Sequence, residues 1–151
     1  FAEVQAAFHP HPGTMPVNAY VALQKSTDLI LKEGLEATWA RHDRVARVVR
    51  TGVRAMGLQL MAAEEAACAN LTVIMADDQF LPQAYFDFMI EEYGMQVGLG
   101  LGEYMTRSVR IGHMGLNANL EAVVPCLVGF EQFLRRQGHD VPRGSSLAGL
   151  E

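Results

Sequence analysis

One arginine stands in the middle of an apolar segment, and it is the residue whose chemistry is easiest to specify. Arg110 lies between Val109 and Ile111, in a short run typical of a β-strand. Because side chains alternate along a strand, Arg110 points to the face opposite its two neighbours. The planar fork of a guanidinium suits a carboxylate held by two hydrogen bonds, and this indicates a carboxylate-binding site. An internal salt bridge stays open as the alternative, with three acidic residues as possible partners: Glu91, Glu92 or Glu103.

Three glycines precede that strand at alternate positions, Gly98, Gly100 and Gly102. A glycine-rich loop can bind phosphate through its backbone amides. The dinucleotide fingerprint, however, needs Gly-x-Gly-x-x-Gly between a strand and a helix, whereas here the spacing is shorter and a strand follows. We therefore favour a tight turn that brings the backbone close to a neighbouring group, with phosphate binding as the alternative.

Other groupings of reactive residue types predict no site. The five arginines spread over residues 41–54 lack interleaved aromatic residues, and the net charge is −5, so a solvated face is favoured over a nucleic-acid surface. His9 and His11 have no evident third ligand, so no metal site is expected. Cys68 and Cys126 fit neither a zinc spacing nor a disulfide framework.

Length and composition indicate one folded domain or one large fragment of a longer protein. The chain has 151 residues, of which 50% are hydrophobic and 19% are charged, so it can bury a core. No apolar run approaches the roughly 20 residues that cross a bilayer, and no targeting signal is recognisable. A cytoplasmic protein that binds neither membranes nor nucleic acid is expected.

Hydrophobic periodicity and helix-ending residues predict the elements that must position Arg110. Thr14 is expected to cap the first helix and Asn117 the last. The tail from residue 139 onward is polar and is expected to fray. The expected elements are helices over 14–33 and 35–56, strands over 58–60 and 71–75, a helix over 82–93, strands over 95–97 and 108–113, and a helix over 117–137.

This order, α-α-β-β-α-β-β-α, predicts an α/β fold with a small mixed sheet and helices packed on one face.

Seven short segments, taken in their order along the chain, resemble segments of a known family. They are Thr14-Met15-Pro16-Val17, Glu33-Gly34-Leu35-Glu36, Trp39-Ala40-Arg41-His42, Ala55-Met56-Gly57-Leu58, Gly100-Leu101-Gly102, Arg110-Ile111-Gly112-His113-Met114-Gly115 and Asn117-Ala118.

From about Thr14 onward the chain resembles the C-terminal, small-domain portion of class V, fold type I aminotransferases that depend on pyridoxal phosphate. The resemblance is to the alanine–glyoxylate and serine–pyruvate family. The string from Arg110 to Gly115 is also similar to the pyridoxamine–pyruvate aminotransferases of the same broad family. The resemblance to the aminotransferase family implies a division of the chain into three parts. Residues 1–13 link to an N-terminal large domain, residues 14–138 form the small domain with its entry helix, and residues 139–151 form a polar tail.

The resemblance also implies roles for individual residues. Arg110 occupies the position that binds the substrate carboxylate, and Thr14 the position that contacts the cofactor phosphate of the partner subunit in a homodimer. His11 stands where the family often has tyrosine, so its role in cofactor binding is the weaker expectation. The resemblance implies that the lysine that binds the cofactor covalently lies in the large domain, N-terminal to this segment. Lys25 and Lys32 match no family motif. The chain alone is thus expected to hold no catalytic residue and to be inactive.

For the intact protein, the resemblance implies transfer of an amino group to a small 2-oxo acid such as glyoxylate or pyruvate. Two alternatives stay open. One is pyridoxamine–pyruvate transfer, in which the donor is the free vitamer. The other is a catalytically inactive α/β interaction module, which an absent lysine would permit.

Overall fold

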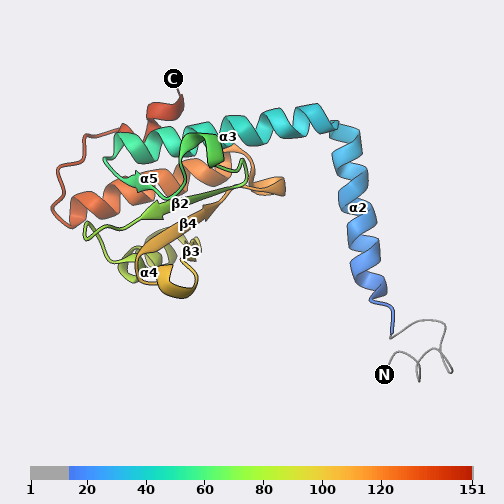
Figure 1. The fold of residues 1–151 in the computed structure, drawn as a ribbon, viewed down its shortest axis with the longest axis horizontal. Coiled ribbons are helices and arrows are strands. Elements are labelled where there is room, and N and C mark those ends of the chain that lie inside the picture. Colours follow the sequence, from blue (N-terminus) through green and yellow to red (C-terminus); the bar gives the residue numbers. More distant parts are fainter. Residues whose placement is uncertain (1–13, 151) are drawn as a thin grey trace. The chain divides into compact units, whose positions relative to one another are not determined.

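The computed structural model describes residues 14–150, so His11 and the linker expected over residues 1–13 lie outside the described residues. The chain divides into two compact units, the first ending at Thr38 and the second beginning at Trp39. Figure 1 shows the ribbon. The helices and strands are α2 (Val17–Glu33), α3 (Leu35–Ala55), β1 (Gln59–Leu60), β2 (Leu71–Met75), α4 (Pro82–Tyr93), β3 (Gly98–Leu99), β4 (Ser108–Gly112) and α5 (Leu120–Arg136). Between residues 14 and 150, no helix combines the length and apolar character needed to span a membrane.

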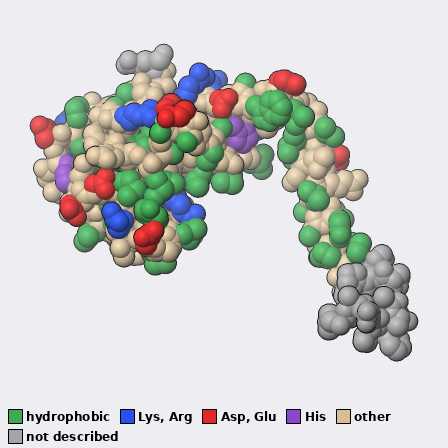
Figure 2. Space-filling model, in the orientation of Figure 1, with side chains coloured by type: hydrophobic (Ala, Val, Ile, Leu, Met, Phe, Trp, Pro, Cys, Tyr) green, Lys and Arg blue, Asp and Glu red, His purple; other side chains and the backbone are tan. Residues whose placement is uncertain are grey.

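Helix α2 begins at a different cap from the one expected. Its N-cap is Pro16, and no side chain accepts a capping hydrogen bond there, so Thr14 does not cap the helix. Gly34 ends α2 with a φ of 91°, and its amide donates to the carbonyl of Ile30 at 2.8 Å. No residue of α2 is buried, and hydrophobic side chains lie along its surface (Figure 2).

The four strands form one sheet in the order β1-β2-β4-β3. The α/β class, the order of elements and the packing of helices on one face are confirmed. The sheet itself is antiparallel at each of its three pairings, whereas a mixed sheet was expected. In the central pairing Val73 lies opposite Arg110, and on the other side of β4 Gly98 lies opposite Arg110. Arg110 therefore sits between two strands.

The strand expected over residues 95–97 is displaced to Gly98–Leu99, and the end of α4 explains the displacement. Gly94 is left-handed, with a φ of 61°, and its amide donates to the carbonyl of Ile90. That bond is the one of the αL helix end, and the amide of Met95 donates further back, to the carbonyl of Met89 at 3.1 Å. Because the amide of Met95 is hydrogen-bonded to the end of α4, strand pairing with β4 begins only at Gly98.

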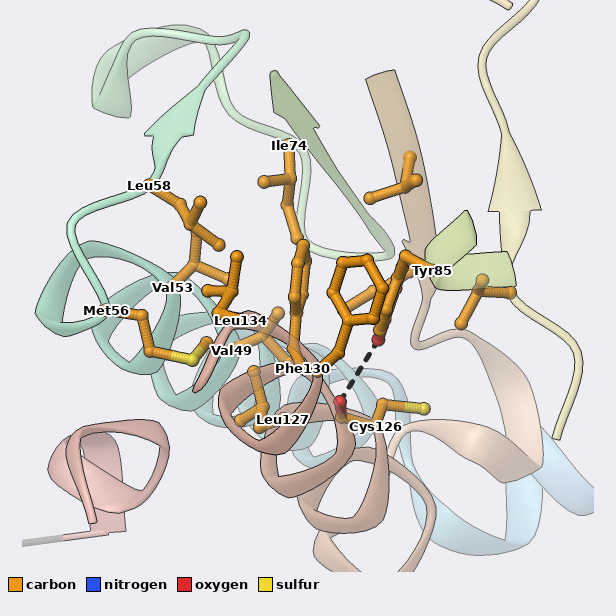
Figure 3. Close-up of a cluster of buried hydrophobic side chains, with 14 of the residues drawn as sticks. Val49, Val53, Met56, Leu58, Ile74, Tyr85, Cys126, Leu127, Phe130 and Leu134 are labelled. Atoms are coloured by element: carbon orange, nitrogen blue, oxygen red, sulfur yellow. Dashed lines mark hydrogen bonds between the residues drawn. The ribbon is translucent and has the colours of Figure 1, made fainter. Parts of the chain in front are cut away.

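The core lies between one face of the sheet and the three helices of the larger unit (Figure 3). Ile74 of β2 and Val109 of β4 are fully buried there. Tyr85 of α4 stacks on Phe130 of α5 with ring centroids 4.0 Å apart, and its hydroxyl donates to the carbonyl of Cys126 at 3.1 Å. Burial raises the pKa of Tyr85 well above its usual range, so the hydroxyl stays protonated and keeps donating.

Helix α5 is capped by Asn119, not by Asn117. The side chain of Asn119 accepts a hydrogen bond from the amide of Ala122 at 2.8 Å. Asn117 instead ends a short 3-10 helix, Gly115–Asn117. Both asparagines suit a cap, but only Asn119 has the extended backbone that an N-cap requires.

The expectation of a frayed tail is wrong for its described part. Residues Ser145–Leu150 form a 3-10 helix, and Ser146 is buried. The carboxylate of Glu131 accepts hydrogen bonds from the amide of Gly144 at 2.9 Å and from the amide of Ser146 at 3.0 Å. A side chain on Gly52 would lie 2.5 Å from the carbonyl oxygen of Ser146, so the tail packs directly on α3.

Candidate functional site

Arg110 occupies the middle of β4, on the sheet face opposite the core. Its neighbours Val109 and Ile111 are buried at 0% and 3% exposure, whereas Arg110 is only half-buried. Val73 and Gly98, its partners across the two pairings, are half-buried as well. The alternation expected from the sequence is confirmed, and it places a guanidinium on a face that the helices do not cover.

One nitrogen of the guanidinium is engaged by the protein itself. The Nε of Arg110 donates to the carbonyl of Leu99 at 2.7 Å. The two terminal nitrogens make no hydrogen bond with any residue between 14 and 150, and no salt bridge in that range includes Arg110. One proposed acidic partner, Glu92, pairs instead with Arg136 at 2.9 Å. Among the described residues, no acidic side chain pairs with the terminal nitrogens of Arg110.

Each of the three glycines before β4 occupies its position for a different structural reason. Gly98 lies against the Arg110 side chain, and Gly102 adopts a left-handed φ of 56°. A side chain on Gly100 would collide with the carbonyl of Tyr104, and the Gly100 amide donates to Ser108 at 2.9 Å. This agrees with a tight turn. Because the Gly100 amide is committed to the sheet, phosphate binding by this loop gains no support.

Two residues at the start of α3 hold the loop that follows β4. The Nη1 of Arg41 donates to the carbonyls of Gly115 at 2.8 Å and Ala118 at 3.0 Å. The amide of Gly115 donates to the Nε2 of His42 at 3.1 Å. The sequence predicted a solvated face for Arg41. Instead, the two side chains fix the backbone that leaves the Arg110 strand.

Two other arginines of α3 are also engaged, which limits the solvated face that was expected. Arg50 and Arg54 both pair with the carboxylate of Glu64, and the Arg50 contact is 2.9 Å. Arg44 and Arg47 are exposed, as the prediction requires. Helix α3 therefore carries two kinds of arginine. Arg41, Arg50 and Arg54 contact specific partners in the loops, whereas Arg44 and Arg47 are exposed.

His113, for which the sequence pattern predicts no role, anchors the end of β4. Its Nδ1 lies 3.2 Å from the carbonyl of Ala69 and can only donate there, so Nε2 accepts from the Thr72 hydroxyl at 2.8 Å. Burial lowers the pKa of His113, which favours the neutral ring that this pattern requires. A histidine after a strand gives no sign of a partner 41 positions away, so the sequence could not reveal this contact.

The remaining predicted residues belong to the smaller unit. Thr14, Lys25 and Lys32 are exposed there, and the Thr14 hydroxyl makes no hydrogen bond with another described residue. Arg110 belongs to the larger unit. The alternative that Thr14 serves only as a helix cap is therefore wrong, and its role toward a cofactor stays a prediction.

The known proteins similar to this chain include several aminotransferases. The serine–glyoxylate aminotransferase of Arabidopsis thaliana is 33% identical over 138 residues, covering 91% of the chain and 34% of the relative. The pyridoxamine–pyruvate transaminase of Mesorhizobium japonicum is 32% identical over 139 residues, covering 91% and 35%. The chain is homologous to the class V aminotransferases. No family model matches the chain.

Solved aminotransferase structures agree with this assignment. The pyridoxamine–pyruvate aminotransferase of Mesorhizobium loti superposes with a TM-score of 0.87 at 32% identity, covering 95% of this chain and 37% of that one. The ureidoglycine–glyoxylate aminotransferase of Bacillus subtilis gives a TM-score of 0.80 at 28% identity, covering 85% and 34%. The chain thus spans about a third of the length of the aminotransferases it matches.

Proposed function

We propose that this chain is the small-domain part of an aminotransferase that uses pyridoxal phosphate and transfers an amino group to a small 2-oxo acid such as glyoxylate or pyruvate. The observation that most supports the proposal is the position and pairing of the Arg110 guanidinium. Its terminal nitrogens lie on the uncovered sheet face and have no acidic partner between residues 14 and 150. Relatives named for transfer to glyoxylate or pyruvate support the same substrate class.

Arg110 would bind and orient the carboxylate of the substrate. An amino acid donor and a 2-oxo acid acceptor both carry a carboxylate next to the reacting carbon, so one anchor serves both halves of the reaction. A bidentate contact fixes the plane of the carboxylate and therefore the direction of the reacting bond. The loop held by Arg41 and His42 would keep the end of the Arg110 strand in place.

The described residues fit the cofactor only in part. Thr14 has a hydroxyl that is not used as a helix cap, and it would donate to the cofactor phosphate of the partner subunit in a homodimer. The Gly100 amide is committed to the sheet, and Lys25 and Lys32 lie on α2 outside any family motif. When bound, pyridoxal phosphate supplies an electron-withdrawing ring that makes a proton on the substrate α-carbon acidic. We therefore place most of the cofactor site, with its lysine, in a large domain outside this chain.

We further propose that residues 14–138 form the small domain with its entry helix, and that the tail from residue 139 packs on it through Glu131. Relatives that are aminotransferases give no support to an inactive interaction module. The test of the proposed function is amino transfer by the intact protein from a panel of amino acids to glyoxylate and pyruvate. Absence of transfer to every 2-oxo acid tried, with cofactor bound, contradicts it.

Pyridoxamine–pyruvate transfer is the second candidate. It is favoured by the TM-score of 0.87 over 95% of the chain and by the string Arg110-Ile111-Gly112-His113-Met114-Gly115. Pyridoxamine carries no carboxylate, so Arg110 would act only on the pyruvate half of that reaction. Offering pyridoxamine and amino acids as competing donors separates the two candidates.

A further inference from the structure

The Arg110 side chain crosses the edge strand of the sheet to reach its hydrogen-bond partner. Strand β3 is the outermost strand, and Gly98 lies directly opposite Arg110. The amide of Gly100 faces β4, where it donates to Ser108 at 2.9 Å. Backbone groups alternate along a strand, so the carbonyl of Leu99 faces the outer edge, away from β4. The bond from Arg110 Nε to Leu99 at 2.7 Å therefore requires the side chain to pass over Gly98.

A side chain at position 98 would crowd that path. A Cβ at position 98 would lie 3.3 Å from the Cβ of Arg110, 3.3 Å from its Nε and 3.4 Å from its Nη2. The two separations of 3.3 Å are tighter than most ordinary contacts and the third is at the lower limit of ordinary contact, so the Arg110 side chain would have to shift by a few tenths of an ångström. The backbone of Gly98 has no left-handed φ, so glycine is not required there by conformation. The crowding that a larger residue would meet there comes from the Arg110 side chain.

We propose that Gly98 and the Leu99 carbonyl together orient Arg110, so that its two terminal nitrogens, not Nε, form the fork that holds the substrate carboxylate. Gly98 is then a positioning residue. A guanidinium can offer a carboxylate either the pair Nε and Nη2 or the pair Nη1 and Nη2. The bond to Leu99 occupies Nε and leaves only the second pair. This inference rests on the proposed carboxylate-binding role of Arg110.

The test compares Gly98→Ala, Arg110→Ala and the double variant in the intact, cofactor-loaded protein. The readouts are the KM for pyruvate and the Kd of propionate, a carboxylate that cannot accept an amino group. Gly98→Ala is expected to raise both by about tenfold, the loss of one charged hydrogen bond, with a melting temperature near that of the wild type. In the Arg110→Ala background Gly98→Ala should change neither value further, since its effect passes through Arg110.

Gly112→Ala is the matched control. It adds a methyl group two residues from Arg110 on the same strand, yet that group would meet only the Met114 Cε, at an ordinary 3.8 Å. Propionate binding by this variant should stay near the wild-type value. A loss as large as that of Gly98→Ala would overturn the inference, because the effect would then not depend on contact with Arg110.

The outcomes separate this inference from the proposed function. If Arg110→Ala binds propionate normally, the proposed carboxylate site fails. If Arg110→Ala loses binding while Gly98→Ala retains it, the positioning role of Gly98 is overturned. An equal loss from Gly98→Ala in both backgrounds also overturns it, because the role is then structural. A crystal structure of the wild-type propionate complex gives an answer even if Gly98→Ala does not fold. It should show both terminal nitrogens on the carboxylate, and a carboxylate on Nε contradicts the inference.

Discussion

His42 accepts a hydrogen bond from the amide of Gly115 at 3.1 Å, although the two residues lie 73 positions apart in the sequence. Arg41 contacts the same loop through the carbonyls of Gly115 and Ala118. Together they join the start of α3 to the backbone that leaves β4. A hydrogen bond to a charged group stabilises more than one between neutral groups, so Arg41 should contribute most of the stability of this connection.

Arg41→Gln should lower the free energy of unfolding. Loss of the charged donor leaves two carbonyls short of a partner, at a cost of about 1–3 kcal/mol. The measurement is urea unfolding of the variant beside the wild type. Arg44→Gln, an exposed arginine of the same helix, is the matched control and should change the midpoint little. Equal midpoints for Arg41→Gln and the wild type would show that the loop does not depend on this contact.

Glu131 should make the docked tail sensitive to acid. Burial acts to raise the pKa of Glu131, but hydrogen bonds from Ser146 and Gly144 outweigh it, and the net shift is downward. A carboxyl whose pKa is lower in the folded state stabilises the fold above its unfolded pKa. That contribution is lost as the pH falls through the folded value. The stabilisation should therefore be complete at neutral pH, begin to fall near the ordinary glutamate pKa of about 4.3, and disappear only below the lower pKa of the folded state.

The corresponding variant is Glu131→Gln, compared with the wild type in denaturant unfolding at a series of pH values. The gap in stability should be constant from pH 6 to pH 8 and should shrink in the acid range. Glu91→Gln, an exposed glutamate with no such hydrogen bonds among the described residues, serves as the control. If the difference in stability between Glu131→Gln and the wild type does not change with pH, the ionised carboxylate is not its cause, and the prediction is wrong.

Local pattern accounts for the elements that were predicted correctly. The ends of α3 and α4 lie at glycines that stop an apolar periodicity, and β2 is a β-branched run with the expected bounds. The half-buried position of Arg110 follows from strand alternation alone. These features depend on residues within a few positions of one another, which is the range over which a sequence pattern is informative.

The features that the sequence could not predict depend on distant partners. The choice of Asn119 over Asn117 as a cap depends on where the loop held by Arg41 ends. The tail docks because Glu131 accepts from Gly144 and Ser146, which a polar composition does not reveal. The orientation of the Arg110 guanidinium likewise depends on a strand whose position was expected three residues earlier.

Thr14 offers a test of the cofactor assignment. If its hydroxyl donates to the cofactor phosphate across a homodimer, Thr14→Ala in the intact protein should weaken cofactor retention by about tenfold or more, since a hydrogen bond to a charged group is worth roughly 1.5–3 kcal/mol. Release of pyridoxal phosphate on dialysis, followed by absorbance, measures the effect. Thr14→Ser, which keeps the hydroxyl, should retain the cofactor. Equal retention by all three proteins would leave Thr14 without this role.

The two lysines of the chain offer a separate test. Lys25 and Lys32 lie on α2 and match no family motif, so neither is expected to bind the cofactor covalently. Borohydride reduction of the chain with pyridoxal phosphate, followed by peptide mass analysis, should show only sparse labelling. Stoichiometric modification of either lysine would contradict the assignment of the cofactor lysine to a domain outside this chain.

Arg110 gives the most direct test of the proposed function. Its terminal nitrogens have no partner between residues 14 and 150, so replacement would remove their contact with the substrate, together with the internal bond from Nε to Leu99. Arg110→Ala in the intact enzyme should lower kcat/KM for glyoxylate or pyruvate at least tenfold, because each charged hydrogen bond contributes roughly 1.5–3 kcal/mol. Arg110→Lys should rescue activity only in part, since an ammonium group cannot reproduce the planar fork.

The pattern across substrates distinguishes a carboxylate-binding role of Arg110 from a structural one. Every carboxylate-bearing donor and acceptor should be affected by Arg110→Ala, because the same fork would bind each of them. With pyridoxamine as donor, only the 2-oxo acid half should slow, since pyridoxamine has no carboxylate to lose. A variant that merely loosens the sheet would slow both halves alike and lower the melting temperature. Normal kcat/KM for the 2-oxo acid, together with a lower melting temperature, would show that Arg110 stabilises the sheet and does not bind substrate.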